Sequence, residues 1–168
     1  MTLKAVPVID ISPFLEGTPE GKKKVADEVG RACRDIGFLV ITGHGVPETL
    51  IHQTYDTAKA FFDLPEEEKM KVERPSPDQV RGYSPLMGEG LAYSLDDKTP
   101  PDLKESFSVG PTNVPAGDPY YTGPEAGPHF APNVWPASPS LLKPVWTEYF
   151  HAMEKLSAQL MAMFAMAL

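Results

Sequence analysis

Residues 35–46, with the sequence DIGFLVITGHGV, decide how the first half of this chain folds. The five residues from Phe38 to Thr42 are apolar almost throughout, which predicts a strand covered on both faces. A Gly43–His44–Gly45 turn closes the strand. A histidine between two glycines at a strand end is open to three interpretations: a metal ligand, a catalytic base or a part of the scaffold.

A helix is predicted before this strand. Thr18 supplies an N-cap, Pro19 the first helical position and Gly37 the C-cap. Apolar residues at spacings of four, three and four indicate one buried face, made of Val25, Val29, Ala32 and Ile36. Cys33 is expected on the same apolar face as a small buried hydrophobe. Further upstream, Val6 to Ser12 (VPVIDIS) predicts a short strand at a sheet margin.

Two helices are predicted after the turn. Pro47 opens the first, whose expected buried stripe is Ile51, Tyr55, Ala58 and Phe62. Residues 64–72, LPEEEKMKV, predict a short second helix with Pro65 at its first position. Its glutamates lie where the helix dipole favours negative charge, so we expect a solvated helix start.

The character of the sequence changes from Arg81 onward. The segments RGYSP (81–85) and KESFSVG (104–110) predict short strands, and Phe107 and Val109 alternate with serines in the second. Residues 111–139 hold eight prolines and three glycines, a density that predicts no regular element. A disordered linker usually lacks aromatic residues. We therefore expect an ordered loop, pinned by its aromatic residues Tyr120, Tyr121, Phe130 and Trp135.

A long helix is predicted at the end of the sequence, beginning near Pro139 or Pro144. Its apolar stripe is Tyr149, Met153, Leu156, Leu160, Met163 and Ala167. Beyond Gln159 the helix is apolar on every side, which predicts burial all round. Nine apolar residues are too few to cross a membrane, so we expect more protein to pack against this helix.

Composition narrows the function. The net charge is −8, which argues against a nucleic-acid binder because such a protein shows a basic face. The single cysteine, Cys33, permits no intrachain disulfide, and the first residues lack the apolar run of a signal peptide. These features favour a cytoplasmic protein with no membrane partner.

Seven segments, in this order, resemble a known family: VPVIDIS, ACRDIGFLVITGHGV, FFDLPEEEKMKV, QVRGYSP, DLKESFSVG, NVWP and YFHAMEKLSAQLMAMFAMAL. They look like the N-terminal region of the isopenicillin N synthase-like oxygenases. These form a branch of the non-haem iron, 2-oxoglutarate-dependent dioxygenases. Each motif alone is weakly specific, but the similarity runs from Val6 to Leu168 in the family's order.

The resemblance implies an α+β fold that leads into a double-stranded β-helix, or jelly roll. Residues 1–110 would be the N-terminal dioxygenase region with the first jelly-roll strands. Residues 111–139 would be a Pro/Gly-rich ordered loop, and residues 140–168 the helix that braces the roll. The roll is incomplete in this chain, and the catalytic C-terminal half would lie beyond Leu168.

The family's iron site is missing from the sequence. The family binds Fe(II) with a His-x-Asp pair and a distant histidine, which leaves positions open for 2-oxoglutarate and O2. The residues two places after His44, His52, His129 and His151 are Val46, Thr54, Ala131 and Met153, so none is a carboxylate. The family's Arg-x-Ser clamp for 2-oxoglutarate has only a chance match at residues 74–76. We therefore expect no catalytic residue, metal or cofactor site of the family's kind on this chain alone.

The resemblance also assigns roles to residues that are present. It places His44 in the scaffold, because the family has a similar turn after this strand. It makes Arg81 and Tyr83 candidates for substrate binding, since in related synthases an arginine and a tyrosine at the start of the jelly roll reach the substrate, including a carboxylate on it. The alternative is an arginine paired with a carboxylate and a tyrosine in the core. Residues 87–94, MGEGLAYS, predict an ordinary surface loop, with a lid as the alternative.

Two functions from different classes follow. In the first, the chain is the N-terminal portion of an Fe(II)- and 2-oxoglutarate-dependent oxidoreductase that hydroxylates, desaturates or closes a ring in a small organic substrate, using O2. Some family members do not use 2-oxoglutarate, and that variant stays open. In the second, the chain is a non-catalytic binding module or truncated remnant with an exposed apolar helix end.

Overall fold

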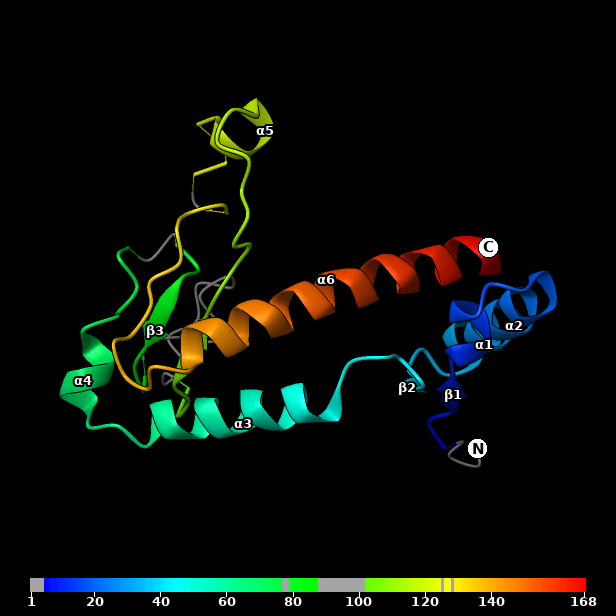
Figure 1. The fold of residues 1–168 in the computed structure, drawn as a ribbon, viewed down its shortest axis with the longest axis horizontal. Helices are drawn as coiled ribbons and strands as arrows, with labels where there is room; N and C mark the ends of the chain where they lie inside the picture. Colours follow the sequence, from blue (N-terminus) through cyan, green and yellow to red (C-terminus); the bar gives the residue numbers. More distant parts are fainter. Residues whose placement is uncertain (1–4, 77–78, 88–101, 125, 128) are drawn as a thin grey trace. The chain divides into compact units, whose positions relative to one another are not determined.

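The computed structural model describes residues 5–76, 79–87, 102–124, 126–127 and 129–168. The expected surface loop at residues 87–94 therefore lies, from residue 88 on, outside the described residues. Helices and strands are mixed along the chain (Figure 1). By its internal contacts the chain divides into one unit of residues 1–51 and 151–168, and a second of residues 52–150.

The first unit contains a two-stranded parallel sheet. Strand β1 (Val8–Asp10) pairs with β2 (Val40–Thr42), with Val8 opposite Val40 and Ile9 opposite Ile41. Helices α1 (Ser12–Leu15) and α2 (Pro19–Asp35) lie between the strands in sequence. The predicted cap of α2 is confirmed: the Thr18 hydroxyl accepts a hydrogen bond from the Gly21 amide, and Pro19 follows it.

The predicted full covering of the strand at residues 38–42 is wrong for the described residues. Phe38 is 72% exposed and Val40 is 49% exposed. The sheet has two strands, and one of its faces lies open. Ile9 faces the core and is buried, whereas Val8 and its partner Val40 lie on the opposite face and are both exposed.

The buried residues of α2 are Val25, Ala26, Val29, Gly30 and Ala32. Val25, Val29 and Ala32 are buried as predicted, whereas Cys33 is exposed. At Gly30 the contact is close, because a Cβ there would lie 3.3 Å from the Cβ of Ala167. Cys33 lies one turn after Val29 on the same face, in the last turn of α2, and no buried residue of the helix follows it.

The second unit is built around a core of aromatic and aliphatic side chains. Helices α3 (Glu48–Phe62) and α4 (Glu66–Met70) lead into strand β3 (Gly82–Ser84), which pairs antiparallel with β4 (Ser106–Ser108). Both strands were predicted, and Phe107 is buried between less buried serines. The buried members of the core are Phe61, Val72, Tyr83, Phe107 and Leu142.

The predicted buried stripe of α3 is displaced by one position. Tyr55 is 72% exposed, and the buried residues are Leu50, Thr57 and Phe61. A threonine takes this place because its hydroxyl is satisfied twice: it donates to the Gln53 carbonyl at 2.7 Å and accepts from Trp146 Nε1 at 3.1 Å. The solvated start of α4 is as predicted, with Glu66, Glu67 and Glu68 exposed.

The proline-rich segment holds one regular element that the sequence did not predict. Helix α5 (Pro119–Thr122) is a single turn capped by the Asp118 side chain, which accepts from the Tyr120 amide at 2.9 Å. The rings of Tyr120, Tyr121 and Phe130 pack on one another at centroid separations of 4.8–5.7 Å. Trp135 packs against the core of the second unit.

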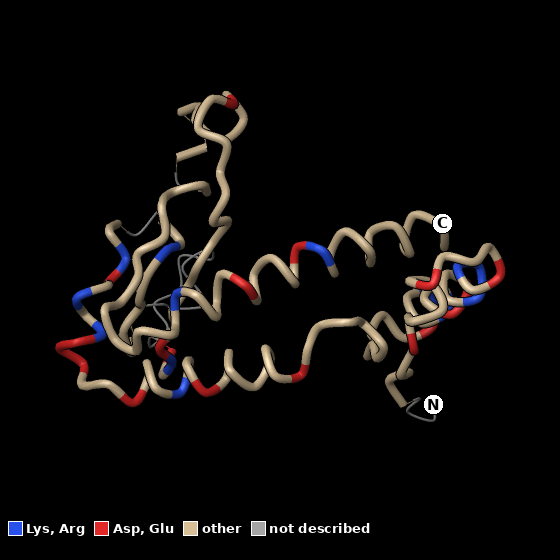
Figure 2. Tube along the Cα trace, in the orientation of Figure 1, with Lys and Arg blue, Asp and Glu red and all other residues tan. Residues whose placement is uncertain are grey.

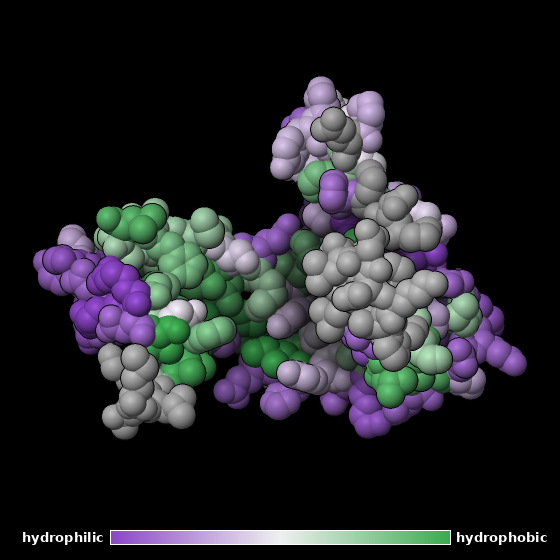
Figure 3. Space-filling view, turned by 180° about the vertical axis from the view of Figure 1, so that it is seen from behind, coloured by the Kyte–Doolittle hydropathy of each residue, from purple (hydrophilic) through white to green (hydrophobic). Residues whose placement is uncertain are grey.

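Helix α6 (Leu142–Ala167) begins after Pro139, whose carbonyl accepts from the Leu142 amide at 3.0 Å. Pro144 falls in its first turn, where a missing N–H costs little. The predicted stripe is buried or half-buried along its length. Burial all round is wrong for the described residues: Met163 is buried, whereas Met161 is 64% and Met166 50% exposed. No charged residue follows Lys155 (Figure 2), and hydrophobic side chains gather on the surface of the first unit (Figure 3).

No helix in the described ranges is both long enough and apolar enough to span a membrane.

Candidate functional site

Strand β3 carries Tyr83, and Arg81 directly precedes the strand; both were predicted for substrate binding. Its backbone is held on two sides, because β4 pairs along one edge and residues 72–74 lie along the other. The Tyr83 amide donates to the Val72 carbonyl at 2.7 Å, and the Arg74 amide donates to the Tyr83 carbonyl at 3.0 Å. Gly82 makes this approach possible: its φ is +100°, and a Cβ there would lie 2.6 Å from the Val72 oxygen.

Tyr83 is anchored by a partly buried ion pair. Its hydroxyl donates to Glu105 Oε2 at 2.6 Å, and Lys69 Nζ binds the same oxygen at 2.6 Å. The Lys69 ammonium also lies over the Tyr83 ring, 5.4 Å from its centroid. Helix α4, strand β3 and the residue before β4 are thus joined at one carboxylate oxygen.

The charges of this cluster stabilise one another. Burial is the largest single influence and acts against the charged forms of Lys69 and Glu105. Their mutual hydrogen bond, their charges and the contact with Tyr83 together outweigh it, so the pKa of Lys69 is raised and that of Glu105 is lowered. For Tyr83, burial and the hydrogen bond to Glu105 both raise the pKa of the phenol. Tyr83 therefore serves here as a neutral donor to a charged pair.

Arg81 is buried under the loop that follows β4. Its residue is 7% exposed, and its guanidinium donates to the carbonyls of Val80, at 2.5 Å, and His129. Burial lowers the pKa of the guanidinium. Its Nε is buried and has no hydrogen-bond partner among the described residues. The described residues thus leave one donor of this buried guanidinium unused.

The loop around Arg81 is fixed by an asparagine. Asn133 Oδ1 accepts from the Gly110 amide at 2.7 Å, and Asn133 Nδ2 donates to the Gly110 carbonyl at 2.9 Å. Gly110 must lack a side chain, because a Cβ there would lie 2.1 Å from the Arg81 guanidinium. The asparagine of the NVWP motif thus holds the backbone that covers Arg81.

His44 lies in the first unit and is half-buried. Its Nδ1 accepts a hydrogen bond from the Val46 amide at 3.1 Å, which satisfies the backbone of the turn that it belongs to. Gly43 has φ +67°, and a Cβ there would lie 2.1 Å from Asp10 Oδ1. This geometry agrees with the scaffold role that the resemblance implied.

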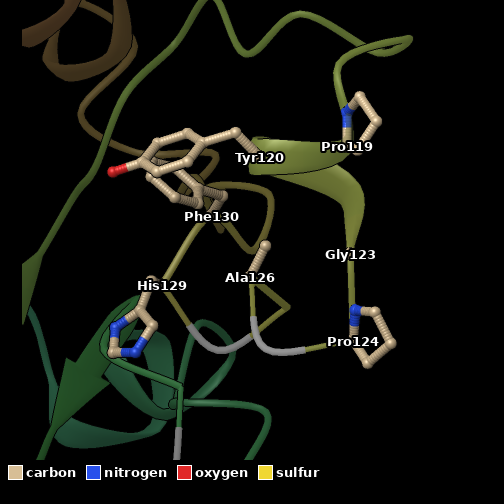
Figure 4. A pocket seen from close by; sticks show the side chains of 7 residues that line it. All are labelled: Pro119, Tyr120, Gly123, Pro124, Ala126, His129 and Phe130. Carbon is tan, nitrogen blue, oxygen red and sulfur yellow. The ribbon is translucent and has the colours of Figure 1, made fainter.

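A cavity of about 600 Å³ opens beside the loop helix α5 (Figure 4). The rings of Tyr120 and Phe130 lie next to one another at its edge, and the His129 ring points away from them. His129 also supplies the carbonyl to which Arg81 donates.

Iron does not fit the described residues. Among them, no three side chains of His, Cys, Asp or Glu lie close enough to hold a metal ion. Together with the missing His-x-Asp pair, this leaves no ligand set here for the iron of the family, so no chemical step is derived through it.

Sequence reasoning missed Lys69 and Asn133. Lys69 looked like part of a solvated charge run, and only its partner Glu105, 36 residues away, explains its burial. Asn133 was visible as the first residue of NVWP, but its bonds to Gly110 are a tertiary feature.

Comparison with known proteins identifies the family. Residues 6–138 match the family model described as non-haem dioxygenase in morphine synthesis N-terminal. The chain is 34% identical over 171 residues to the 2-oxoglutarate-Fe(II) type oxidoreductase hxnY of Emericella nidulans, covering 100% of this chain and 47% of that protein. It is 38% identical over 140 residues to the 2-oxoglutarate-dependent dioxygenase tropC of Talaromyces stipitatus, covering 79% and 39%.

Solved structures agree with these relatives. A full-length Neurospora crassa protein, crystallised with alpha-KG and thymine, superposes with a TM-score of 0.74 at 26% identity, covering 96% of this chain and 48% of that one. A 2OG-Fe(II) oxygenase family protein from Caulobacter crescentus shares the fold with a TM-score of 0.76 at 24% identity, covering 98% and 49%. The chain thus spans about half the length of the relatives it matches.

The motifs, the family model and the structural neighbours agree, and the chain belongs to the isopenicillin N synthase-like family of non-haem Fe(II)- and 2-oxoglutarate-dependent dioxygenases, whose N-terminal region it matches.

Proposed function

We propose that this chain is the substrate-side N-terminal portion of an oxidoreductase that uses Fe(II), 2-oxoglutarate and O2 to hydroxylate, desaturate or close a ring in a small organic substrate. The iron and 2-oxoglutarate ligands are supplied by residues outside these 168. The matched relatives, about twice as long, support this division. Iron supplies the activation of O2 when it is bound. Strands β3 and β4, in residues 1–110, are the first strands of the jelly roll. Residues 140–168 form the helix that braces the roll, and the ordered loop of residues 111–139 connects the strands to this helix.

Arg81 is the residue we propose for binding a substrate carboxylate. The observation that carries this role is its buried guanidinium with an unpaired Nε. A charged donor held in a site of low polarity binds an anion more strongly than the same donor in water. Tyr83 lies two residues further on, in β3, but its hydroxyl reaches a substrate only by exchanging its bond to Glu105, since the residue is 1% exposed.

The chemistry of the relatives is compatible with a small polar substrate. One rice relative, 34% identical, is named a homoarginine-6-hydroxylase, and the Neurospora protein was crystallised with thymine. We propose a carboxylate-bearing compound of that size, acted on in the cytoplasm, where the single cysteine stays reduced. The net charge of −8 supports the absence of a nucleic-acid partner.

The test is succinate release by the full-length protein with Fe(II), 2-oxoglutarate and a panel of small carboxylic acids. We expect substrate-dependent succinate release, and in Arg81→Gln a KM for the substrate raised at least tenfold with an unchanged KM for 2-oxoglutarate. Arg81→Lys, which keeps the charge, separates loss of the contact from loss of folding, and the melting temperature of each variant is compared. Succinate release with an unaltered substrate KM in both variants would show that Arg81 does not bind the substrate, while the proposed oxidoreductase function would still hold.

The second candidate is a non-catalytic binding module. The exposed apolar residues of the first unit, among them Phe38, Val40 and Met161, favour it. Absence of succinate release under every condition, from a folded protein, would support this candidate against the first.

A further inference from the structure

A second cavity lies in the second unit, between the proline-rich loop and the first turns of α6. Its volume is about 580 Å³, within the range of sites that hold small molecules. It shares Phe130 with the cavity of Figure 4. Its described lining includes neither Arg81 nor Tyr83, the two candidates for substrate binding.

Three aromatic side chains line this cavity. Tyr121 and Phe130 meet edge to face, with ring centroids 4.8 Å apart and planes at 77°. Trp135 packs against the hydrophobic core of the second unit, and this contact fixes its position in the cavity wall. Walls of this kind favour a flat apolar or aromatic body, because the ligand can pack against ring faces and edges.

The cavity has a definite charge. Lys143, in the first turn of α6, is the sole charged side chain among its described lining residues. No carboxylate of the described residues forms an ion pair with it. Thr147 lies one turn further along the same helix face and adds a hydroxyl. A lone ammonium in a chain of net charge −8 selects for an anion.

The cavity is also preformed. Asn133, one of its lining residues, is bonded to both backbone groups of Gly110, which fixes the two arms of the loop to one another. A ligand that enters therefore orders little of the protein, and less binding free energy is lost.

We propose that this cavity is a binding site for a small molecule with a flat aromatic body and a carboxylate or similar anionic group. The aromatic body packs against Tyr121, Phe130 and Trp135, and the anionic group binds Lys143.

The test is isothermal titration of the full chain with 2-naphthoate and with its neutral counterpart 2-naphthamide. Lys143→Gln should weaken binding of 2-naphthoate about tenfold and leave 2-naphthamide unchanged, because a charge-assisted contact is lost. Lys155→Gln, an exposed lysine further along α6, is the matched control and should change neither. Ala116→Trp fills the cavity from an exposed loop position and should weaken both probes. Ala137→Trp, exposed and outside the lining, controls for the added indole.

Each remaining outcome contradicts the proposal. Failure of 2-naphthoate to bind the unaltered protein would overturn it. If Lys143→Gln and Ala116→Trp both bound 2-naphthoate as tightly as the unaltered protein, the probe would bind elsewhere, for example at Arg81. Weakening by Ala116→Trp without an effect of Lys143→Gln would contradict the assigned charge selectivity.

Discussion

The Lys69 ammonium and the Glu105 carboxylate form a 2.6 Å ion pair across 36 residues of sequence, and Tyr83 donates to the same carboxylate oxygen. The Lys69 side chain is 10% exposed and that of Glu105 26%. The pair links α4 to the residue before β4, and through Tyr83 to β3, which directly follows Arg81. Its loss should therefore affect the second unit more than the loss of any surface pair.

Glu105→Gln should lower the free energy of unfolding by about 2 kcal/mol, because it leaves the buried Lys69 ammonium without a counter-charge. The matched control is Glu68→Gln, which removes the Lys71–Glu68 pair, with side chains 65% and 48% exposed. That change should cost less than about 0.5 kcal/mol. Urea unfolding of both variants measures the difference, and equal costs would contradict a special role for the buried pair.

Acid should remove this contribution. The pKa of Glu105 is lowered from its ordinary value of 4.5, so its stabilisation is present above that value and is lost as the pH falls through the lowered pKa. The unfolding free energies of the unaltered protein and of Glu105→Gln should therefore converge as the pH falls below the lowered pKa of Glu105. A gap between them that stays constant from pH 6 to pH 3 would be inconsistent with the ion pair.

Gly82→Ala should destabilise the protein by at least about 2 kcal/mol, since it combines a strained φ of +100° with a Cβ 2.6 Å from the Val72 oxygen. Gly17 has a similar φ of +89°, but a Cβ added there would meet no atom within 4 Å, so Gly17→Ala reports strain alone, about 1 kcal/mol. Thermal melts compare the two. A Gly82 variant no less stable than the Gly17 variant would show that the close approach to Val72 is unimportant.

Thr57→Val should cost about 1–2 kcal/mol, because the indole nitrogen of Trp146 loses its acceptor in a buried place. Thr57→Ser keeps the hydroxyl and removes only a methyl group, so it should cost less than the valine variant. The order of the two melting temperatures is the measurement. If valine were tolerated better than serine, packing rather than the hydrogen bond would explain the buried threonine.

Local signals in the sequence were sufficient for several elements. Thr18 and Pro19 predicted the start of α2, and the alternation around Phe107 predicted β4. These features depend on residues within one or two turns of each other, so the sequence alone contains the cause.

Features that depend on distant partners were not predictable in this way. The burial of Lys69 requires Glu105, and the position of Thr57 requires Trp146. The exposure of Cys33 on α2 and of Val40 on β2 depends on which faces of that helix and that strand other parts of the chain cover. In the candidate site, Arg81 and Tyr83 came from resemblance, whereas the unpaired Nε and the clamp by Asn133 required coordinates.

We propose that this chain is part of a longer oxygenase whose iron ligands lie outside these 168 residues. The decisive measurement is the intact mass of the protein that carries this sequence, purified from its natural source. We expect a mass of roughly twice 18.4 kDa, in proportion to the 47% of hxnY that the chain covers. A mass of 18.4 kDa would contradict it, because the chain would then be the whole protein and would lack the family's iron site.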